Sequence, residues 1–323
     1  MAVAFVVLVA TVLAPCRVRG EDSEQDDEPS TNVIDRGHAA VSRGVEAVAD
    51  RMDSFFQDRR FEETYNQTRI RIGIGGLIAT QGRSEFEPGL RLDLRLSALS
   101  DRLSFVVAGG RDDDIQDDRL SGEEDGGGAG FLRFFITRDR RAQLSIDAGL
   151  AFRPSPDPFT RLRGSYAYPI GKFLLRPTQF LFWERRDGLG FTSRLELDRR
   201  FGQWRLARLR GEVERSQEGT DGYEWKAIIS FQRLTWKSSG WRARFRVRGA
   251  TDPPQEPEDY RVQFLYRWLA YSKWLFIDIE PELMWRRNHD WEISPGISLR
   301  LEALFGGPYL KKLEERVEGK SDG

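Results

Sequence analysis

Apolar and polar residues alternate along most of the chain, from residue 68 to residue 305. The clearest stretch is 241–249, WRARFRVRG, in which four arginines alternate with tryptophan, alanine, phenylalanine and valine. Successive side chains of a β-strand point to opposite faces, so this stretch predicts a strand with one apolar face and one arginine-rich face. A half-buried strand of a soluble sheet and a strand of a membrane barrel both fit this pattern.

The same period of two predicts about fourteen strands, within a range of roughly twelve to sixteen. Clear examples are 70–74, 90–96, 144–152, 223–231, 260–268, 275–285 and 291–305. Tight connectors such as 138–140 and 201–203 alternate with longer, polar or proline-rich ones such as 110–128 and 250–258. Outer-membrane barrels have short periplasmic turns and longer outer loops, so we predict an even strand number with both termini periplasmic.

The tryptophans help to separate a membrane barrel from a soluble sheet. They lie near the connectors of both kinds, at Trp204, Trp236, Trp241 and Trp274 and at Trp183, Trp225, Trp285 and Trp291. Amphipathic aromatic side chains collect at both interfaces of a bilayer, whereas a soluble sandwich scatters its tryptophans through a core. We therefore predict the fold class as all-β: a transmembrane antiparallel up-and-down β-barrel preceded by a short N-terminal helix.

From Thr68 to Phe305 the chain resembles a bacterial outer-membrane β-barrel of porin-like architecture. Its last segment is similar to the terminal strand of that family, in which alternating apolar residues end in an aromatic residue, here Phe305. A tail over 306–323 departs from the family pattern. The resemblance implies the outer membrane of a Gram-negative bacterium, contact with outer-membrane lipid and insertion by the barrel-insertion machinery.

The segments before and after the barrel have other compositions. Residues 1–20 begin with an apolar run and predict a secretory signal peptide, with a lipobox ending at Cys16 as the alternative. Residues 21–36 are dense in acids and predict a disordered linker. The barrel is predicted over 67–306 and a polar tail over 307–323. Cys16 is the single cysteine, so a processed chain would hold no disulfide.

Residues 37–62 predict an amphipathic periplasmic helix. Its apolar residues recur at spacings of four, three, four and three, which is typical of one helix face. They are Val41, Val45, Val48, Met52 and Phe55. The helix could dock on the barrel mouth, enter the lumen, or bind a periplasmic partner or a second copy of the chain. We favour docking on its own barrel.

Composition excludes a helical membrane protein, because charged residues make up 31% and the mean hydropathy is −0.54. The net charge is only −1, and no nucleic-acid partner is expected. Enzyme chemistry has little support, since the two histidines are His38 and His289 and no serine lies beside His289. The acidic stretch 111–128 lacks the glycine that a calcium loop requires at its sixth position, so no metal site and no cofactor is predicted.

The polar faces of the strands carry the candidate functional residues. We predict that a lumen is lined by Arg69, Arg71, Arg91, Arg95, Arg194, Arg242, Arg244, Arg246, Arg248, Arg261, Arg267, Asp278, Glu280, Glu282 and Arg300. The arginines of 242–248 and 261–267 would form one basic wall, facing an acidic wall from Asp278 to Glu302. Arginine binds anions in a fixed fork, and rings of it select anions. Alternatively, acids and bases pair across strands and fill the lumen.

These patterns favour a channel for passive diffusion of small anionic or zwitterionic solutes through an arginine-rich lumen. One alternative is a structural or assembly barrel with a charge-paired lumen, in which the helix binds a periplasmic partner. A second alternative is a lipid-modifying enzyme of the barrel type. The solute and the oligomeric state do not follow from these patterns.

Overall fold

The computed structural model describes the barrel strands and a few residues before them. The described residues are 49, 52–53, 55–56, 69–80, 84–96, 100, 102–109, 128–139, 141–152, 155–219, 222–236, 238–251, 257–271 and 274–306. The predicted signal peptide, acidic linker and polar tail, and most of the predicted helix, lie outside these residues.

The strands follow one another along the chain with short or polar connectors between them. They are β1 (Arg69–Ala79), β2 (Glu85–Arg95), β3 (Leu103–Gly109), β4 (Gly128–Arg138), β5 (Ala142–Phe152), β6 (Pro156–Tyr166), β7 (Tyr168–Ile170), β8 (Phe173–Glu184), β9 (Gly188–Arg200), β10 (Arg205–Ser216), β11 (Glu224–Trp236), β12 (Ser239–Ala250), β13 (Pro257–Tyr271), β14 (Leu275–Arg286) and β15 (Ile293–Gly306). A short 3₁₀ turn, η2 (Arg287–His289), connects the last two strands.

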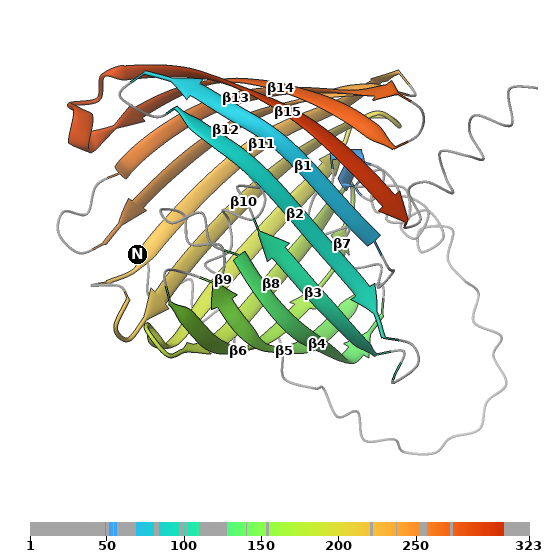
Figure 1. Cartoon of the computed structure of the whole chain (residues 1–323), viewed down its shortest axis with the longest axis vertical. Helices are drawn as coiled ribbons and strands as arrows, with labels where there is room; N and C mark the ends of the chain where they lie inside the picture. The colour runs from blue at the N-terminus through green and yellow to red at the C-terminus, as the bar shows by residue number, and fades with distance from the viewer. Residues whose placement is uncertain are drawn as a thin grey trace, which may run out of the picture.

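The strands form one closed antiparallel barrel (Figure 1). Apart from β6 and β7, each strand pairs with its sequence neighbours; β1 pairs with β15, and β6 pairs with β8. The three residues of β7 continue the line of β6 along the edge of β8, so the wall has fourteen strands. The predicted all-β barrel and its strand number are confirmed.

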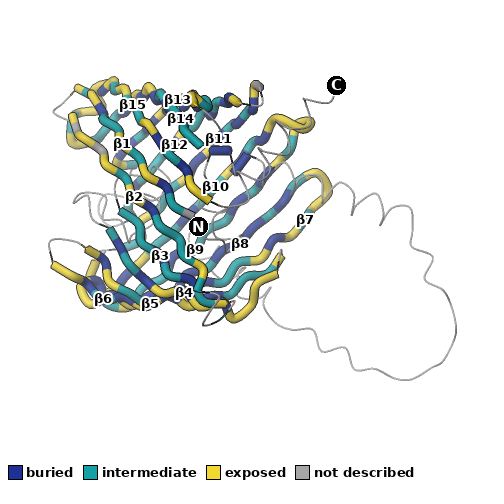
Figure 2. Tube along the Cα trace, turned by 45° about the vertical axis from the view of Figure 1, so that its right-hand side comes forward, coloured by how far each residue is buried: buried dark blue, intermediate teal, exposed yellow. Residues whose placement is uncertain are grey.

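The register places each residue on a definite face. The arginines of β12 pair with polar or lumen-facing positions of β11, for example Arg242 with Gln232 and Arg244 with Ser230. Trp241 and Phe245, between these arginines, point to the other side and are partly or well exposed. Figure 2 shows the resulting alternation of buried and exposed positions along each strand. The stretch 241–249 is therefore a barrel strand with its arginines inside.

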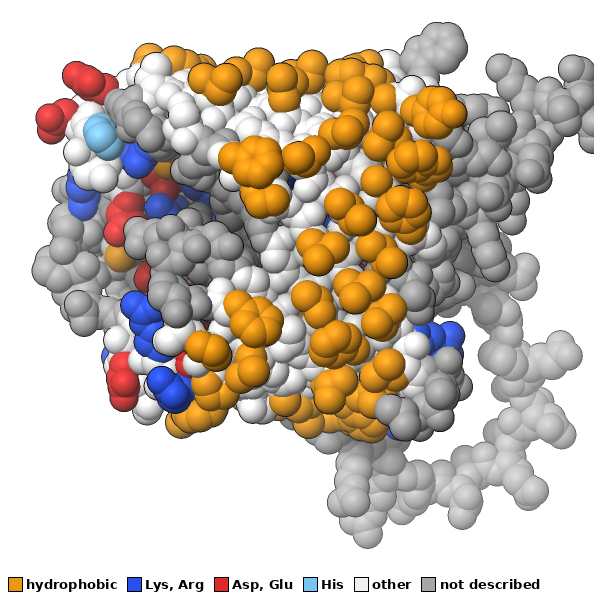
Figure 3. Space-filling view, viewed as in Figure 1, with side chains coloured by type: hydrophobic (Ala, Val, Ile, Leu, Met, Phe, Trp, Pro, Cys, Tyr) orange, Lys and Arg blue, Asp and Glu red, His pale blue; other side chains and the backbone are white. Residues whose placement is uncertain are grey.

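The outer surface is apolar. Large hydrophobic side chains such as Ile74, Leu209 and Ile229 are about half exposed, and Figure 3 shows such side chains spread over the wall, with charged groups gathered at one rim. Exposed apolar surface of this extent is incompatible with water and fits the hydrocarbon of a bilayer. Among the described residues, no helix is long and apolar enough to span a membrane.

Aromatic pairs mark the two ends of this apolar surface. At the end with the tight turns, Trp241 stacks on Phe264 and Trp274 stacks on Phe305, with ring centroids 5.7 and 5.8 Å apart. At the other end, the rings of Tyr260 and Trp291 lie 5.4 Å apart. Such aromatic girdles flank the lipid-facing band of outer-membrane barrels. We call the two ends the tight-turn end and the loop end. β1 begins and β15 ends at the tight-turn end.

Candidate functional site in the barrel lumen

The predicted lining residues lie on lumen-facing positions of their strands. The side chains of Arg71, Arg91, Arg242, Arg246, Arg261, Arg267, Asp278, Glu280 and Glu282 are buried. Those of Arg194, Arg244, Arg248 and Arg300 are partly buried, and Arg95 is exposed at the end of β2. The side chain of Arg69 lies outside the described residues. The role of these residues as the lining of an open lumen stays a prediction.

One carboxylate is held by two arginines in the wall formed by β4, β5 and β6. Asp147 is fully buried and accepts hydrogen bonds from Arg133 at 2.7 and 2.8 Å. Arg161 donates to the same carboxylate at 2.7 Å from the other side. These three residues occupy directly opposed positions on the three strands, so the antiparallel register alone brings them together. A buried carboxylate of this kind must be paired, and here both of its oxygens are used.

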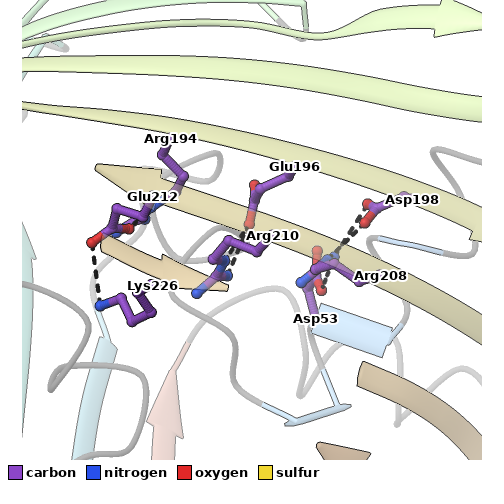
Figure 4. A network of polar contacts seen from close by, with 8 residues as sticks. All are labelled: Asp53, Arg194, Glu196, Asp198, Arg208, Arg210, Glu212 and Lys226. Carbon is purple, nitrogen blue, oxygen red and sulfur yellow. Dashed lines mark hydrogen bonds and ion pairs between the residues drawn. The ribbon is translucent and has the colours of Figure 1, made fainter. Parts of the chain in front are cut away.

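A ladder of ion pairs follows β9 and β10 along the lumen (Figure 4). Arg208 donates to Asp198 at 2.7 Å, and Arg210 donates to Glu196 at 2.8 Å. One step further toward the loop end, Glu212 accepts from Arg194 at 2.6 Å and lies 3.2 Å from the ammonium group of Lys226 on β11. Glu212 thus lies between bases of β9 and β11, and the other two acids each bind a base of the adjacent strand.

Our prediction of a basic wall facing an acidic wall is wrong in its geometry. β13 and β14 are hydrogen-bonded neighbours, so the two groups of charges meet along one seam instead of facing each other across the lumen. The pairs Arg267–Asp278 and Arg261–Glu282 lie 3.1 and 3.9 Å apart, and Arg267 also donates to Glu302. Strands that follow one another in an up-and-down barrel are neighbours, so the bases of β13 and the acids of β14 lie next to each other.

Bases and acids are exposed to the lumen to different extents. Across β9 to β12 the base is more exposed than its acid: 13% for Arg194 against 6% for Glu212, and 35% for Arg248 against 1% for Asp259. An additional contact of Arg248 with the rim residue Glu258 is the exception, because that carboxylate is half exposed. In these ion pairs the cationic group is therefore the more accessible partner, and the carboxylate that it binds is more deeply buried.

Part of the predicted helix lies inside the barrel. Ala49, Met52, Asp53, Phe55 and Phe56 are helical and buried, and they belong to one apolar cluster or ion-pair network with lumen-facing residues of the wall. In Figure 1 the blue helical piece lies at the end of the barrel where β15 ends. Entry into the lumen is one of the positions that the sequence pattern allows for this helix. Val41, Val45 and Val48 lie outside the described residues.

Several lumen residues escaped the sequence analysis. Five phenylalanines face inward on β4, β6 and β8: Phe131, Phe135, Phe159, Phe180 and Phe182. Guanidinium groups of Arg161, Arg163 and Arg194 lie 5.4–5.5 Å from the ring centroid of Phe180. Such contacts are favourable for a cation over an aromatic face. These phenylalanines lie at the same alternating positions of their strands as the lumen arginines. This spacing is the feature of the sequence that could have placed them in the lumen.

The ladder residues Asp198, Arg208 and Arg210, and the acid Asp259, were also missed. Around β10 the apolar–polar alternation is broken, because Leu206 occupies a lumen-facing position among charged residues. Within the described part of the chain, no group of three or more histidine, cysteine, aspartate or glutamate side chains is arranged to hold a metal ion. The described lumen is therefore a lattice of ion pairs and aromatic side chains.

No protein-family profile and no curated protein matches the chain. Among solved structures, it is similar to the KdgM porin, at 9% identity over 73% of this chain and 99% of that one, with a TM-score of 0.38. The CymD monoaromatic hydrocarbon channel has 9% identity over 76% and 90% of the two chains, with a TM-score of 0.48. OccK10 of Pseudomonas aeruginosa has 9% identity over 75% and 99%, with a TM-score of 0.42.

The architecture of the chain rests on its own closed hydrogen-bond register and its apolar outer surface. From these two features the chain is a closed transmembrane β-barrel of porin-like architecture.

Proposed function

We propose that this barrel is an outer-membrane channel for passive diffusion of small anionic or zwitterionic solutes. The closed fourteen-strand wall with an apolar outer surface supports the membrane part of the proposal. A barrel of this strand number is wide enough that wall side chains alone need not fill it. No cofactor takes part, since diffusion needs only a path and a surface that the solute can leave.

The observation that carries the anion preference is the layering of charge on β9 to β12. In these ion pairs the cationic side chain is more exposed than the acid that it binds, as for Arg248 with Asp259 and Arg194 with Glu212. A solute in the lumen therefore meets guanidinium groups first, and guanidinium binds carboxylate or phosphate through paired hydrogen bonds. The carboxylate behind each arginine weakens its hold on the solute, and conduction requires such release.

The structural or assembly barrel is the second candidate, and the ion-pair lattice favours it. Pairs such as Arg133–Asp147 and Arg208–Asp198 hold neighbouring strands together and need no solute. A lattice that serves structure alone conducts no ions. Conductance therefore separates the two candidates.

The test is an ion-selectivity measurement on purified protein in a planar bilayer under a KCl gradient. The proposal expects stable conductance steps and a reversal potential displaced toward that of chloride. Replacing Arg244 and Arg248 together by serine removes two partly exposed lumen cations and should shift the reversal potential toward potassium. Absence of conductance from protein with the heat-modifiable mobility of a folded barrel would refute the channel.

Arg199→Gln is the matched control for charge removal. Arg199 is exposed on the outer face of β9, where its guanidinium lies 5.2 Å from the ring centroid of Phe173 and 4.9 Å from that of Phe201. It is a positive charge outside the lumen, so its loss should leave the reversal potential unchanged. An equal shift in Arg199→Gln would show that the effect is one of total charge and would refute the lumen mechanism.

A further inference from the structure

The tight-turn end of the lumen has an apolar collar. We use this name for Leu206, Leu234, Leu265, Phe276 and Leu304, which are buried and come from β10, β11, β13, β14 and β15. All five occupy lumen-facing positions; four lie within two residues of the tight-turn end of their strands, and Leu265 lies six residues from the end of β13. Apolar side chains inside a polar lumen are stable only when other apolar groups cover them.

The collar is covered by the helical residues that precede the barrel. Ala49, Met52, Phe55 and Phe56 form one buried cluster with it, and the rings of Phe55 and Phe276 meet edge to face at 6.2 Å. On β12 the wall is shaped to fit as well, since a Cβ added at Gly240 would lie 2.9 Å from the ring of Phe55. Five wall strands and one glycine thus form a seat for this segment.

Three lumen arginines add polar contacts to the seat. Arg208 donates to the buried carboxylate of Asp53 at 2.8 Å, and it also binds Asp198 of the wall (Figure 4). Arg267 donates to the carbonyl oxygen of Phe55 at 3.3 Å, and the guanidinium of Arg242 lies 5.7 Å from the ring centroid of Phe56. The segment is therefore held through its side chains and its backbone.

A small polar cavity remains beside the segment. It is lined by Phe56 on one side and by charged wall residues on the other, among them Arg242, Arg267, Arg300 and Glu302. These residues come from β12, β13 and β15, next to the seam where the acids and bases of the wall meet. A small ion in this cavity would lie between a phenylalanine of the segment and the guanidinium groups of the wall.

We propose that this helical segment is the constriction of the channel, held in its seat by the Asp53–Arg208 contact. The inference rests on the proposed channel function and adds to it the element that sets the size limit for solutes. Small ions pass through the cavity beside Phe56, and larger solutes pass only when the segment leaves the collar. Arg208 keeps Asp198 as a partner when Asp53 is absent, so loss of the Asp53 contact frees the segment without leaving an unpaired charge in the wall.

The experiment has two readouts on the full chain, one of which needs no conduction. In a Cys16→Ser background, Ala49→Cys places a thiol at a fully buried position of the segment, and its reaction with a membrane-impermeant maleimide reports exposure. Asp53→Arg should speed labelling at least tenfold, since repulsion from Arg208 that weakens the seat by about 1.4 kcal/mol corresponds to a tenfold population change. Single-channel conductance and the largest polyethylene glycol that enters the channel should both rise.

Charge exchange separates a specific contact from general damage. Asp53→Arg with Arg208→Asp keeps one base and two acids in the network, so it should restore slow labelling and the small size limit. If heat-modifiable mobility shows that Asp53→Arg does not fold, Asp53→Asn replaces it. This variant removes the same ion pair without adding repulsion, and it should also speed labelling and raise the size limit.

Equal labelling in Asp53→Arg and its parent would overturn the seat. Faster labelling without a larger size limit would overturn the constriction, while the channel remains. If labelling responds as expected but every folded variant is without conductance, the channel function itself fails, and the constriction fails with it.

Discussion

Asp147 is the most deeply buried acid of the ion-pair lattice, and its replacement by asparagine gives the sharpest test of how the wall is held together. Its carboxylate receives both Arg133 and Arg161, which are themselves only 3–4% exposed. Asparagine has nearly the same shape but only one oxygen acceptor and no charge. The substitution therefore leaves two buried guanidinium groups in contact with an amide, without a counter-charge at that position.

The expected loss follows from the contacts. Removing one partner of a buried ion pair costs about 3–5 kcal/mol, because the remaining charge stays out of water. Two arginines share the Asp147 carboxylate, so the upper part of this range applies. Asp93→Asn is the comparison, because Asp93 is 17% exposed and accepts a hydrogen bond of 3.1 Å from Arg91. A contact that water reaches contributes about 1 kcal/mol or less.

The measurement is the free energy of unfolding in lipid vesicles from urea titration, followed by heat-modifiable mobility and tryptophan fluorescence. Asp147→Asn should lower the urea midpoint strongly and Asp93→Asn only slightly, with the slope of the transition unchanged in both. Equal midpoints for the two variants, or a loss below about 1 kcal/mol for Asp147→Asn, would contradict the view that buried ion pairs carry the stability of the wall.

Two further substitutions test packing and the membrane face. Gly149→Ala should destabilise the barrel by about 3 kcal/mol, because the new Cβ would overlap the Cβ of Phe131 on β4, whereas Gly211→Ala meets nothing within 4 Å and should be neutral. Unfolding titrations of both variants in vesicles check this, and similar losses would refute it. Leu209→Arg places a charge on the lipid face and should cost about 2–4 kcal/mol at mid-bilayer depth, lowering the folded fraction on vesicle insertion; unchanged insertion yield would contradict a lipid-facing β10.

The barrel could be predicted from the sequence because the face on which a strand residue lies depends only on its position within that strand. In a strand such as β12, every second residue belongs to one face, so Arg242 and Arg246 could be assigned to the lumen without knowledge of the neighbouring strands. The connectors then ordered the strands, since sequence neighbours in an up-and-down barrel are also neighbours in space. This reasoning correctly predicted the barrel and its strand number.

Charge balance across strands could not be obtained in the same way, because it depends on register. The sequence shows acids at Asp278 and Glu282 and bases at Arg261 and Arg267. Which of these charges meet is decided by the register between β13 and β14, that is, by which residues lie opposite each other. A shift of one residue would have placed the same charges on opposite faces. The two separate walls that we predicted are for this reason one seam of ion pairs.

The seat of the helical segment is visible in the sequence only as an exception to the alternation. Leu206, Leu265 and Leu304 have the parity of lumen residues, yet they are apolar. An apolar position on a polar face requires an apolar partner, and Met52 and Phe55 of the predicted helix are such partners. Leu206 and Leu304 lie next to the tight-turn ends of their strands, and this shared location is the signal in the sequence that points to the collar.

The reversal potential of the unmodified chain in a planar bilayer under a KCl gradient tests the central claim most directly. The layering of arginines over carboxylates on β9 to β12 predicts conductance with a preference for chloride. A preference for potassium, or no conductance from a barrel shown to be folded, would contradict it.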